Sequence, residues 1–374
     1  MTDYPISGFV APGFEPVRDI FEENFTSDQE LGAGFSTFID GELIIDLHGG
    51  WADRKKTRAW DNRTIVPVFS TTKPIAALVL ASQIDALPAG YDTPVADIWP
   101  AFGAAGKQAV TIAEMVSHQA GLPGFVEPID PALWLDPPAC AAALADLAPM
   151  WSLRSAHGYH PLSWGYLIGE LVLRLSGKSL GTCLRETFTA PGKIDFQIGT
   201  PAAEHDRIAD IMRPRALPDL GEINDATRAA FLTKWAAPDR GGAIWREIEI
   251  PSANGIGTSK AVADLYGVYA HGGVLNGRRV ISETVFDALT ESRVQGQDLV
   301  LPFITEFAAG VMRNNLGIYG PNRNTLCHSG WGGSLALGDP DRHLSAAYVM
   351  NRQSNSLQGD PRAQRLVQTL YGCL

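Results

Sequence analysis

Cysteine is scarce in this chain, and the cysteines that are present show no pairing pattern. They stand at Cys140, Cys183, Cys327 and Cys373 among 374 residues, and none has a partner at the Cys-x-x-Cys spacing of zinc and redox sites. Disulfide scaffolds are short chains dense in cysteine. We therefore expect free thiols, with neither a disulfide framework nor a zinc site.

Positive charge is also in deficit. The 30 Lys and Arg residues stand against 41 Asp and Glu, for a formal net charge of −11. Nucleic acids and anionic membranes both require clustered basic residues, so we expect neither as a partner. No stretch is apolar enough to span a bilayer, and residues 1–5 lack the features of a secretory signal. The resulting expectation is a cytoplasmic enzyme with a small-molecule substrate, its oligomeric state left open.

What remains is the composition of a globular protein, with 45% apolar and 19% charged residues. Helical spacing of apolar residues predicts an amphipathic helix over residues 14–25. Two β-rich runs, at 35–39 and 43–47, are joined by Asp40-Gly41 and predict a hairpin. A further short strand is expected at 65–69. The N-terminal part of the chain is therefore expected to contribute strands to a sheet.

The middle of the chain has a different character. From residue 74 to about residue 250 its pattern is helical, with breaks at Pro and Gly. We expect a short helix over 111–117 with Thr111 as its N-cap, an apolar helix over 162–175 that ends at Gly177, and a helix near 224–235. This part reads as a helical domain.

Sheet signals return in the last third, at 311–312, 335–337 and 344–349, before a final helix over 361–371. Strands at both ends with helices between them indicate an α+β fold. In this arrangement one sheet is assembled from both ends of the chain, and terminal helices flank it.

The corresponding domain division puts the sheet domain in residues 1–73 and 251–374 and an inserted, mainly helical domain in 74–250. Ser70 then lies at the seam between the two. Clefts between domains are favoured places for small-molecule sites. The sequence has no Gly-x-Ser-x-Gly elbow, which argues against an α/β-hydrolase.

Chemistry is expected in the stretch Val68-Phe69-Ser70-Thr71-Thr72-Lys73-Pro74-Ile75. Ser70 and Lys73 fall on one face of a helix that begins there, and the residues that follow are apolar almost all round, as in a buried helix. A serine at a helix N-terminus lies where backbone N–H groups favour developing negative charge. The alternative is an N-cap serine with a solvated lysine. It fits a buried helix poorly, because an unpaired lysine is costly there.

A serine nucleophile needs a proton acceptor and donors for an oxyanion. Lys73 can accept the proton if burial lowers its pKa, or can stay charged and stabilise a phenolate that acts as base. Tyr159 is the second candidate, because it falls in a polar loop just before the apolar helix at 162–175. The alternative interpretation is that Tyr159 and Tyr166 are packing aromatics.

Two further segments carry candidate residues. His157 and His160 suggest a metal, but no third ligand is spaced with them, so we expect none. In Cys327-His328-Ser329-Gly330-Trp331-Gly332-Gly333-Ser334, glycines permit close approach of a ligand, and an edge strand ending there would supply an oxyanion N–H. The alternative is a tight hairpin with His328 in the core.

Taken in order, Ser70-x-x-Lys73, Tyr159 and His328-Ser329-Gly330 resemble the serine β-lactamase and penicillin-binding-protein superfamily. The resemblance is to its class C-like branch, which includes the family VIII carboxylesterases, and extends from about residue 15 to the end. It implies a β-lactamase-like α+β fold, with an antiparallel sheet flanked by N- and C-terminal helices and an inserted all-helical domain. Supporting phrases are Thr111-Ile112-Ala113-Glu114-Met115-Val116-Ser117-His118-Gln119-Ala120-Gly121-Leu122-Pro123, Tyr159-His160 with Gly165, Asn254-Gly255-Ile256-Gly257-Thr258 and Tyr348-Val349-Met350-Asn351.

The resemblance also implies roles for individual residues. Ser70 would be the acylated nucleophile, Lys73 and Tyr159 the shared acid/base pair, and the backbone N–H groups of Ser70 and Trp331 the oxyanion donors. The residues expected to bind substrate are His328, Gly330, Trp331 and Gly332. In a second register, Trp331-Gly332-Gly333 takes the place of His328-Ser329-Gly330 and Ser334 becomes the donor; we prefer the first.

Two departures from the family pattern bear on the substrate. The family's β-lactamases and transpeptidases have Tyr-x-Asn, and here the third position is Pro161, which has no side-chain amide. They also have Lys-Thr-Gly, and here His328, largely neutral at pH 7, replaces the lysine that receives a substrate carboxylate. Both changes weaken recognition of an anionic lactam and leave the acyl-transfer residues in place.

The sequence therefore predicts a serine carboxylesterase that hydrolyses small, short-chain esters through a Ser70 acyl-enzyme, without metal or organic cofactor. The alternatives on the same scaffold are a β-lactamase, a D-amino-acid peptidase or amidase, and an acyltransferase. A non-catalytic binding protein is the alternative of another class. We also expect loops near Trp134 or Trp151 to line the acyl pocket.

Overall fold

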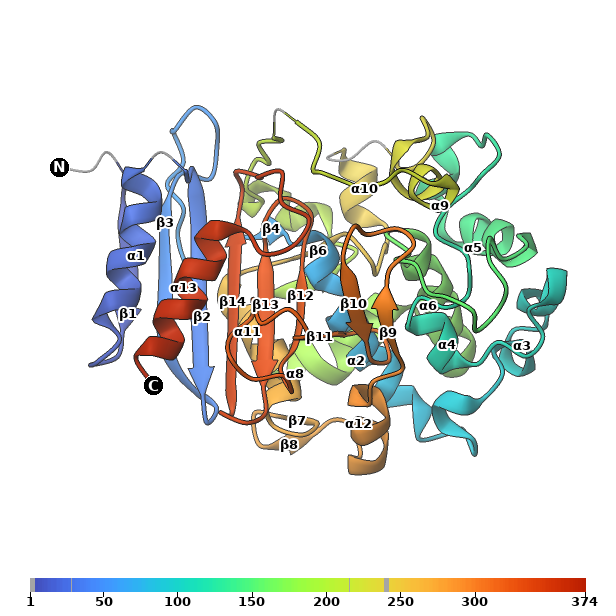
Figure 1. Ribbon diagram of the computed structural model, residues 1–374. Helices are drawn as coiled ribbons and strands as arrows, with labels where there is room; N and C mark the ends of the chain where they lie inside the picture. The colour runs from blue at the N-terminus through green and yellow to red at the C-terminus, as the bar shows by residue number, and fades with distance from the viewer. Residues whose placement is uncertain (1–3, 28, 215, 239–241) are drawn as a thin grey trace.

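A large antiparallel sheet forms the centre of the molecule (Figure 1). The computed structural model describes residues 4–27, 29–214, 216–238 and 242–374. Within these residues, nine strands form the sheet in the order β1-β3-β2-β14-β13-β12-β11-β10-β9. The predicted α+β architecture is confirmed. The strands are β1 (Ile6–Val10), β2 (Gly32–Ile39), β3 (Glu42–Gly50), β9 (Val294–Gln297), β10 (Ile304–Phe307), β11 (Met312–Arg313), β12 (Leu326–Ser329), β13 (Leu335–Asp339) and β14 (Leu344–Met350).

The two ends of the chain join in this sheet. Strand β14 pairs antiparallel with β2, and Ala347 lies opposite Ser36. The predicted hairpin of β2 and β3 turns at Asp40 and Gly41, whose φ angles are +51° and +79°. Two consecutive residues with positive φ are what a tight two-residue hairpin turn requires.

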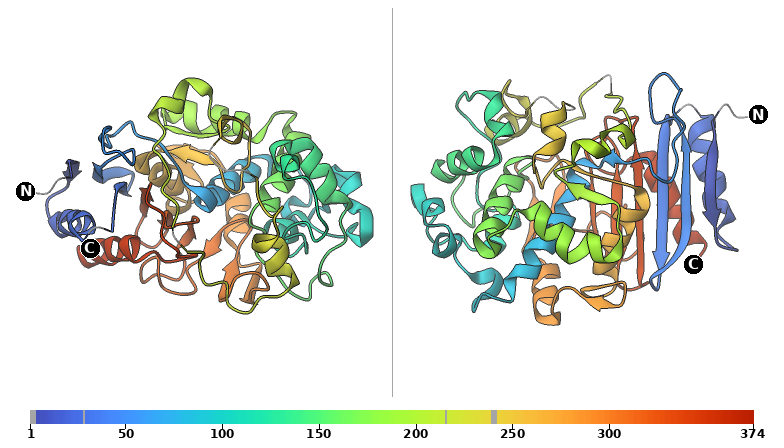
Figure 2. Two further views of the ribbon diagram at one scale, coloured as in Figure 1. Left: turned by 90° about the horizontal axis from the view of Figure 1, so that it is seen from above. Right: turned by 180° about the vertical axis from the view of Figure 1, so that it is seen from behind.

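The two faces of the sheet bury different side chains, because successive residues of a strand point to opposite sides. On β13, Leu335 and Leu337 belong to a core with the helices from the two termini, whereas Ala336 between them packs into a second core. Figure 2 shows the terminal helices on one side of the sheet and α11 on the other. These helices are α1 (Glu15–Thr26), α11 (Ser259–Ala270) and α13 (Pro361–Gly372).

The insertion between the sheet segments is mainly helical, and helices α3 to α6 lie at the end of the molecule away from the termini (Figure 1). Its described helices are α2 (Thr72–Ile84), α3 (Val95–Ile98), α4 (Ile112–Val116), α5 (Pro137–Asp146), α6 (Ser163–Ser176), α7 (Leu180–Leu184), α8 (Ala190–Gly192), α9 (Asp225–Thr227) and α10 (Ala243–Glu247). The remaining elements are α12 (Glu283–Thr290), a small sheet of β4 (Val66–Pro67), β6 (Gly255–Gly257) and β5 (Phe196–Ile198), and the pair β7 (Val274–Leu275) and β8 (Arg278–Arg279).

Two predicted helix ends are confirmed by their hydrogen bonds and backbone angles. The Thr111 hydroxyl accepts from the Glu114 backbone N–H at 3.2 Å, and the Glu114 carboxylate accepts from the Thr111 N–H at 3.0 Å. This capping box starts α4. At the end of α6, Gly177 has a φ of +71°, the left-handed conformation that glycine adopts most readily.

Three elements differ from the predictions. The helix expected near 224–235 is only α9 followed by a π-helical turn over Arg228–Leu232, and it ends where Thr233 becomes extended. The strand expected at 65–69 shortens to β4 because the backbone turns at Phe69. Strand β12 is not an edge strand, since β13 and β11 flank it. However, β11 pairs only with Leu326 and Cys327, so it leaves β12 unpaired on that side beyond Cys327.

The cysteines and the helices settle two further points. All four cysteines are free thiols. Across the described ranges, every helix is too short or too polar to cross a membrane.

Candidate active site

Ser70 lies in a 3₁₀ turn, Phe69–Thr71, that leads directly into α2. The residue before it, Phe69, has a φ of +49°, a left-handed conformation that is unfavourable for a bulky side chain. Most side chains of α2 are buried, which accounts for its apolar sequence. Ser70 itself is partly exposed and lines a cavity of about 60 Å³.

Lys73 is fully buried one helical turn beyond Ser70. Its Nζ atom lies 3.3 Å from the Ser70 Oγ, 2.8 Å from the Pro161 carbonyl oxygen and 3.1 Å from the Ser252 carbonyl oxygen. None of the carboxylates in the described chain forms an ion pair with it. Burial lowers the pKa of Lys73 well below its ordinary value.

Tyr159 comes from the loop before α6 and packs beside Lys73. The Lys73 Nζ lies 4.7 Å from the centroid of the Tyr159 ring, and the ring stacks on Phe307 with centroids 6.3 Å apart. Burial raises the pKa of Tyr159, an effect that exceeds the lowering effect of the nearby Ser70 side chain. The structure thus brings together all three residues that the sequence singled out for catalysis.

Asp298 holds the Tyr159 loop in place, a role that no sequence pattern indicated. Its Oδ1 atom accepts hydrogen bonds from the backbone N–H groups of Tyr159 at 3.0 Å, Val300 at 2.8 Å and Leu301 at 2.9 Å. Burial raises the pKa of Asp298. The Ser252 carbonyl that contacts Lys73 was also missed. These contacts join segments far apart in the chain, so no local motif announces them.

The glycine-rich turn after β12 packs against the nucleophile segment and forms part of the cavity wall. His328, Ser329 and Trp331 line the same cavity as Ser70 and Tyr159. Gly330 and Gly332, which we expected to bind substrate, lie beside the cavity and not in its lining. A side chain at Gly330 would come within 2.2 Å of the Val68 carbonyl oxygen, so glycine permits this close approach.

Ser334 ties this turn to the nucleophile segment. Its hydroxyl donates to the Val68 carbonyl oxygen at 2.7 Å and lies 3.0 Å from the Thr71 hydroxyl. It is not among the residues that line the cavity. The structure therefore places Trp331, and not Ser334, at the cavity wall.

His328 is buried in the wall and neutral. Its Nδ1 lies 2.7 Å from the Ser329 carbonyl oxygen, which requires the hydrogen on Nδ1 and leaves Nε2 as an acceptor. The Nε2 atom is buried without a hydrogen-bond partner in the described chain. Burial lowers the pKa of His328 to about 3. This side chain offers a hydrogen-bond acceptor where the related enzymes with Lys-Thr-Gly offer a cation.

The two histidines of the Tyr159 loop, His157 and His160, form hydrogen bonds within the protein. His160 Nε2 accepts from the Leu122 N–H at 2.8 Å, and its Nδ1 donates to the Gly158 carbonyl oxygen at 2.6 Å. His157 Nε2 lies 2.7 Å from the Thr305 hydroxyl. Both nitrogen atoms of His160 are thus used within the fold.

The expectation that loops near Trp134 or Trp151 line the acyl pocket is wrong, since no residue from 126 to 158 is in the cavity lining. Neither borders the catalytic cavity. Trp134 is buried against Phe125 and Tyr166, and Trp151 lies against His160. The aromatic wall of the cavity instead comes from Phe69, Phe231, Trp245, Phe303 and Trp331.

A serine beside a buried lysine, between a large antiparallel sheet and a helical insertion, defines the class: a serine hydrolase of the β-lactamase fold. The model of the protein family described as Beta-lactamase matches residues 17–369 of this chain. The chain belongs to that family.

Individual relatives agree with this assignment. The chain is 31% identical over 367 residues to the esterase/beta-lactamase LipL of Mycobacterium tuberculosis, which covers 93% of this chain and 83% of that protein. It is 49% identical, with a TM-score of 0.96, to a penicillin-binding protein homolog from Caulobacter crescentus, over 99% of this chain and all of that one. A family VIII carboxylesterase is 38% identical, with a TM-score of 0.91, over 99% of this chain and all of that chain.

Proposed function

We propose that this protein is a serine carboxylesterase that hydrolyses small, short-chain esters through a Ser70 acyl-enzyme. The observation that carries the proposal is the 3.3 Å approach of the buried Lys73 amine to the Ser70 hydroxyl at the wall of a cavity. Two of the similar proteins, at 31% and 38% identity, are described as an esterase/beta-lactamase and as a carboxylesterase.

Lys73 acts as the general base in this proposal. With its pKa lowered by burial, the amine has two N–H bonds and one lone pair. The N–H bonds donate to the carbonyl oxygens of Pro161 and Ser252, which leaves the lone pair for the Ser70 hydroxyl. As the Ser70 Oγ forms its bond to the ester carbonyl carbon, its proton passes to Nζ.

Tyr159 acts as the acid that protonates the leaving alkoxide. Its raised pKa keeps the phenol protonated at neutral pH, so it has a proton to give. When the C–O bond of the tetrahedral intermediate breaks, the alkoxide takes this proton, and the ammonium of Lys73 returns one to the phenolate. Deacylation reverses the transfers: water attacks the acyl carbon, its proton goes to Lys73, and the Ser70 oxygen is reprotonated.

The oxyanion is bound by the backbone N–H groups of Ser70 and Trp331 in this proposal. The two residues line one cavity, Ser70 from the 3₁₀ turn before α2 and Trp331 from the turn after β12. Preorganised N–H donors of this kind contribute roughly 3–4 kcal/mol each to transition-state stabilisation. The absence of Ser334 from the cavity wall supports the preferred register.

The substrate preference follows from the cavity and its polar groups. A catalytic cavity of about 60 Å³ suits a short acyl group better than a long chain. His328 is neutral, and Pro161 has no side-chain amide, so these two positions do not supply the groups that hold the carboxylate and side chain of a lactam in the family's β-lactamases. A small neutral group beside the scissile bond is the chemistry that these residues fit.

Covalent labelling tests the proposal directly. We expect a fluorophosphonate probe to label the protein at one site, and Ser70→Ala to remove both the labelling and the hydrolysis of p-nitrophenyl acetate while the protein stays folded. Appreciable hydrolysis by the Ser70→Ala variant would contradict the nucleophile assignment. No labelling of the folded parent protein would favour a binding protein without catalysis.

A second candidate function is hydrolysis of lactams or D-amino-acid amides. The 49% identical structure, described as a penicillin-binding protein homolog, favours keeping it. Rates for a short-chain p-nitrophenyl ester, nitrocefin and a D-alanyl amide, measured side by side, distinguish the two. The replacements at Pro161 and His328 predict that the ester is turned over fastest.

A further inference from the structure

A second and larger cavity, here called the distal chamber, adjoins the catalytic cavity. Its volume is about 860 Å³, and five residues line both cavities. Four of these are aromatic and form two pairs, Phe69 with Trp245 at 6.4 Å and Phe231 with Trp331 at 5.7 Å between ring centroids. The fifth is Ala230. The two cavities therefore share a border that is mostly aromatic.

The described lining of the distal chamber has more cationic than anionic side chains. It contains three guanidinium groups, of Arg54, Arg213 and Arg246, and one carboxylate, of Asp210. Neither Arg54 nor Arg246 forms an ion pair within the described ranges. Arg54 donates one hydrogen bond to the Ile211 carbonyl oxygen at 3.0 Å, so most of its donors remain available. In a chain with a net charge of −11, this local excess of cations attracts anions to one place.

We propose that the distal chamber binds an anionic group on the part of the ester remote from the scissile bond. This inference rests on the proposed esterase function and adds a substrate class to it. The substrate is an ester with a short uncharged group in the catalytic cavity and a carboxylate, sulfate or phosphate at the end of an apolar spacer. The spacer lies against the aromatic pairs, and the anion reaches Arg54 and Arg246.

The distribution of charge supports this division of the substrate. Next to the scissile bond the candidate receptor for an anion is His328, which is neutral, so a carboxylate there gains nothing from it. In the distal chamber, guanidinium groups supply charged, directional donors that suit carboxylate and phosphate oxygens. The anion is thus recognised far from the reacting carbonyl, where it cannot hinder formation of the oxyanion.

Matched ester pairs test this proposal. One pair is p-nitrophenyl hexanoate and mono-p-nitrophenyl adipate, which differ in a terminal carboxylate on the acyl side. The other is butyl butyrate and 4-(butyryloxy)butyl sulfate, which differ in an anion on the alcohol side. We expect the anionic member of at least one pair to have the higher kcat/KM, and the preference to shrink as salt is added.

Arginine variants complete the test. Arg54→Gln/Arg246→Gln should reduce the anionic preference about tenfold, the effect of losing two partly exposed ion pairs. The control Arg185→Gln/Arg323→Gln makes the same charge change at exposed positions that line neither cavity, and should leave the preference intact. Equal rates within both pairs, or a preference that the chamber variant retains, would overturn the inference. If no ester of either charge were hydrolysed, the esterase proposal itself would fail.

A different set of contacts carries a second inference, on the turn that contains Trp331. The segment after β14 holds two carbonyl groups of this turn: Gln353 Nε2 donates to the Trp331 oxygen at 2.9 Å, and the Ser354 N–H donates to the Gly332 oxygen at 2.8 Å. Gly332 has a φ of +90° and lies against the Gln353 side chain. The orientation of the Trp331 peptide is therefore set from this segment.

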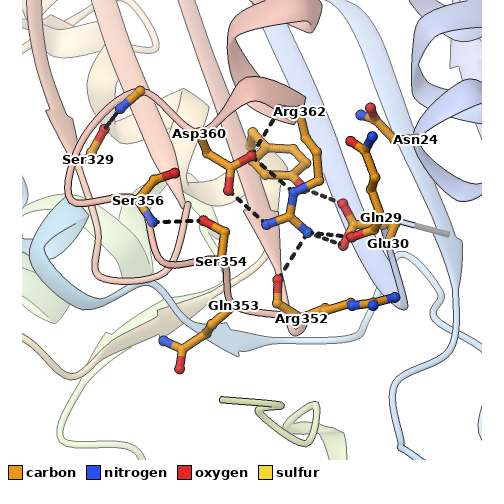
Figure 3. Close-up of polar contacts among 12 residues, drawn as sticks. Asn24, Gln29, Glu30, Ser329, Arg352, Gln353, Ser354, Ser356, Asp360 and Arg362 are labelled. Carbon is orange, nitrogen blue, oxygen red and sulfur yellow. Dashed lines mark hydrogen bonds and ion pairs between the residues drawn. The ribbon is translucent and has the colours of Figure 1, made fainter. Parts of the chain in front are cut away.

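A buried guanidinium group fixes the segment in turn. Figure 3 shows Arg362 between Asp360 and Glu30. Arg362 donates two hydrogen bonds to the Asp360 carboxylate, at 2.8 and 3.0 Å, and one at 3.0 Å each to Glu30 Oε1 and the Arg352 carbonyl oxygen. Two carboxylates share one cation here, and burial raises the pKa of Glu30 to about 7. The cluster anchors the chain immediately before Gln353.

We infer that Gln353 is a positioning residue for the oxyanion site. It acts by holding the Trp331 carbonyl, so that the N–H of the same turn faces the cavity. The inference rests on the proposed role of the Trp331 N–H. Substitution of Arg362 would disturb the fold, because it would leave two buried carboxylates unpaired. Gln353 offers a cleaner test, since it is neutral and its side chain makes this one hydrogen bond in the described structure.

The test compares Gln353→Met with Gln368→Met, which makes the same change at an exposed position of α13. For Gln353→Met, we expect kcat per fluorophosphonate-labelled site to fall about tenfold and KM to change by no more than about twofold. The reason is that displacement of the Trp331 N–H weakens stabilisation of the transition state and not binding of the substrate. A boronic acid, which becomes tetrahedral on Ser70, should bind more weakly in proportion. An unchanged kcat per labelled site, or unchanged boronate affinity, would overturn the inference. Failure of Ser70 labelling in the parent protein would instead overturn the esterase proposal.

Discussion

The amine of Lys73 lies above the ring of Tyr159, with Nζ 4.7 Å from the ring centroid, and burial shifts the pKa values of the two groups in opposite directions. The pKa of the lysine falls and that of the phenol rises, so both groups are driven towards their uncharged forms. A neutral amine accepts a proton and a neutral phenol donates one. The pair is therefore set for base and acid roles without any carboxylate.

The first prediction concerns pH. Because the active form of Lys73 is the neutral amine, kcat/KM should rise with pH through the lowered pKa of this group and level off well below the ordinary lysine value of 10.5. The rate of fluorophosphonate labelling of Ser70, measured from pH 5 to 10, gives this profile. A profile still rising at pH 10 would show that the amine is charged in the free enzyme.

The second prediction concerns the phenol. Tyr159→Phe keeps the ring that stacks on Phe307 and removes only the hydroxyl. We expect kcat to fall by a factor of about 10²–10⁴, the usual contribution of a general acid, with a small change in melting temperature. The variant should lose less activity towards an ester with a good leaving group than towards an alkyl ester, because a good leaving group departs without needing a proton from the phenol. Equal losses for the two esters would argue against the acid role.

The third prediction concerns Asp298. Asp298→Ala removes the acceptor of three buried backbone N–H groups. We expect the free energy of unfolding to fall by about 2–4 kcal/mol, because the N–H groups lose their partner without gaining water. Asp298→Asn keeps a carbonyl oxygen at the same place, so its free energy of unfolding should fall by less. Urea unfolding of both variants measures the difference.

The fourth prediction concerns His328. His328→Lys puts an amine where the acceptor Nε2 now stands, near the Lys73 amine. We expect lower esterase activity, because the added positive charge weakens binding of a neutral ester and disturbs Lys73. We also expect the ratio of nitrocefin hydrolysis to ester hydrolysis to rise at least about tenfold, because the new cation binds the lactam carboxylate. His328→Gln, which is neutral, serves as control and should not raise the ratio. An equal rise in both variants would contradict the charge argument.

The fifth prediction concerns the turn itself. In Gly332→Ala the new Cβ would stand 2.6 Å from the Gln353 Cβ at a φ of +90°. We expect lower stability and a drop in kcat, because the Trp331 peptide must move. Gly106→Ala carries a similar backbone cost at a φ of +86°, with no atom within 4 Å of the added Cβ. Only the Gly332 variant should lose turnover, measured per labelled site.

Much of the site was predictable, because its residue types are informative and their spacing is local. Ser70 and Lys73 are separated by one helical turn, and the loop of Tyr159 borders an apolar helix. Asp298 was not predictable. Its carboxylate accepts hydrogen bonds from N–H groups of its own loop and of Tyr159, 139 residues away. No sequence pattern around position 298 indicates this role.

The fold was predictable where amphipathic periodicity or turn chemistry was strong, as in α1, the β2–β3 hairpin and α13. Helix α11 was missed because it is buried among β2, β13, β14 and α2, and its apolar residues mark no single face. The polar alternation of β9, at the sheet edge, gave an equally weak signal. Trp134 and Trp151 show the opposite error, since large aromatics fill cores more often than they line pockets.

The position of β14 between β2 and β13 has a consequence for synthesis. During translation the nucleophile segment leaves the ribosome early, whereas residues 326–350, which supply the turn with Trp331 and the strand that joins the sheet, leave more than 250 residues later. Contacts of such long sequence separation form slowly. A nascent chain stalled before residue 326 therefore carries Ser70 without this turn, and hydrolase activity begins only when the molecule is nearly complete.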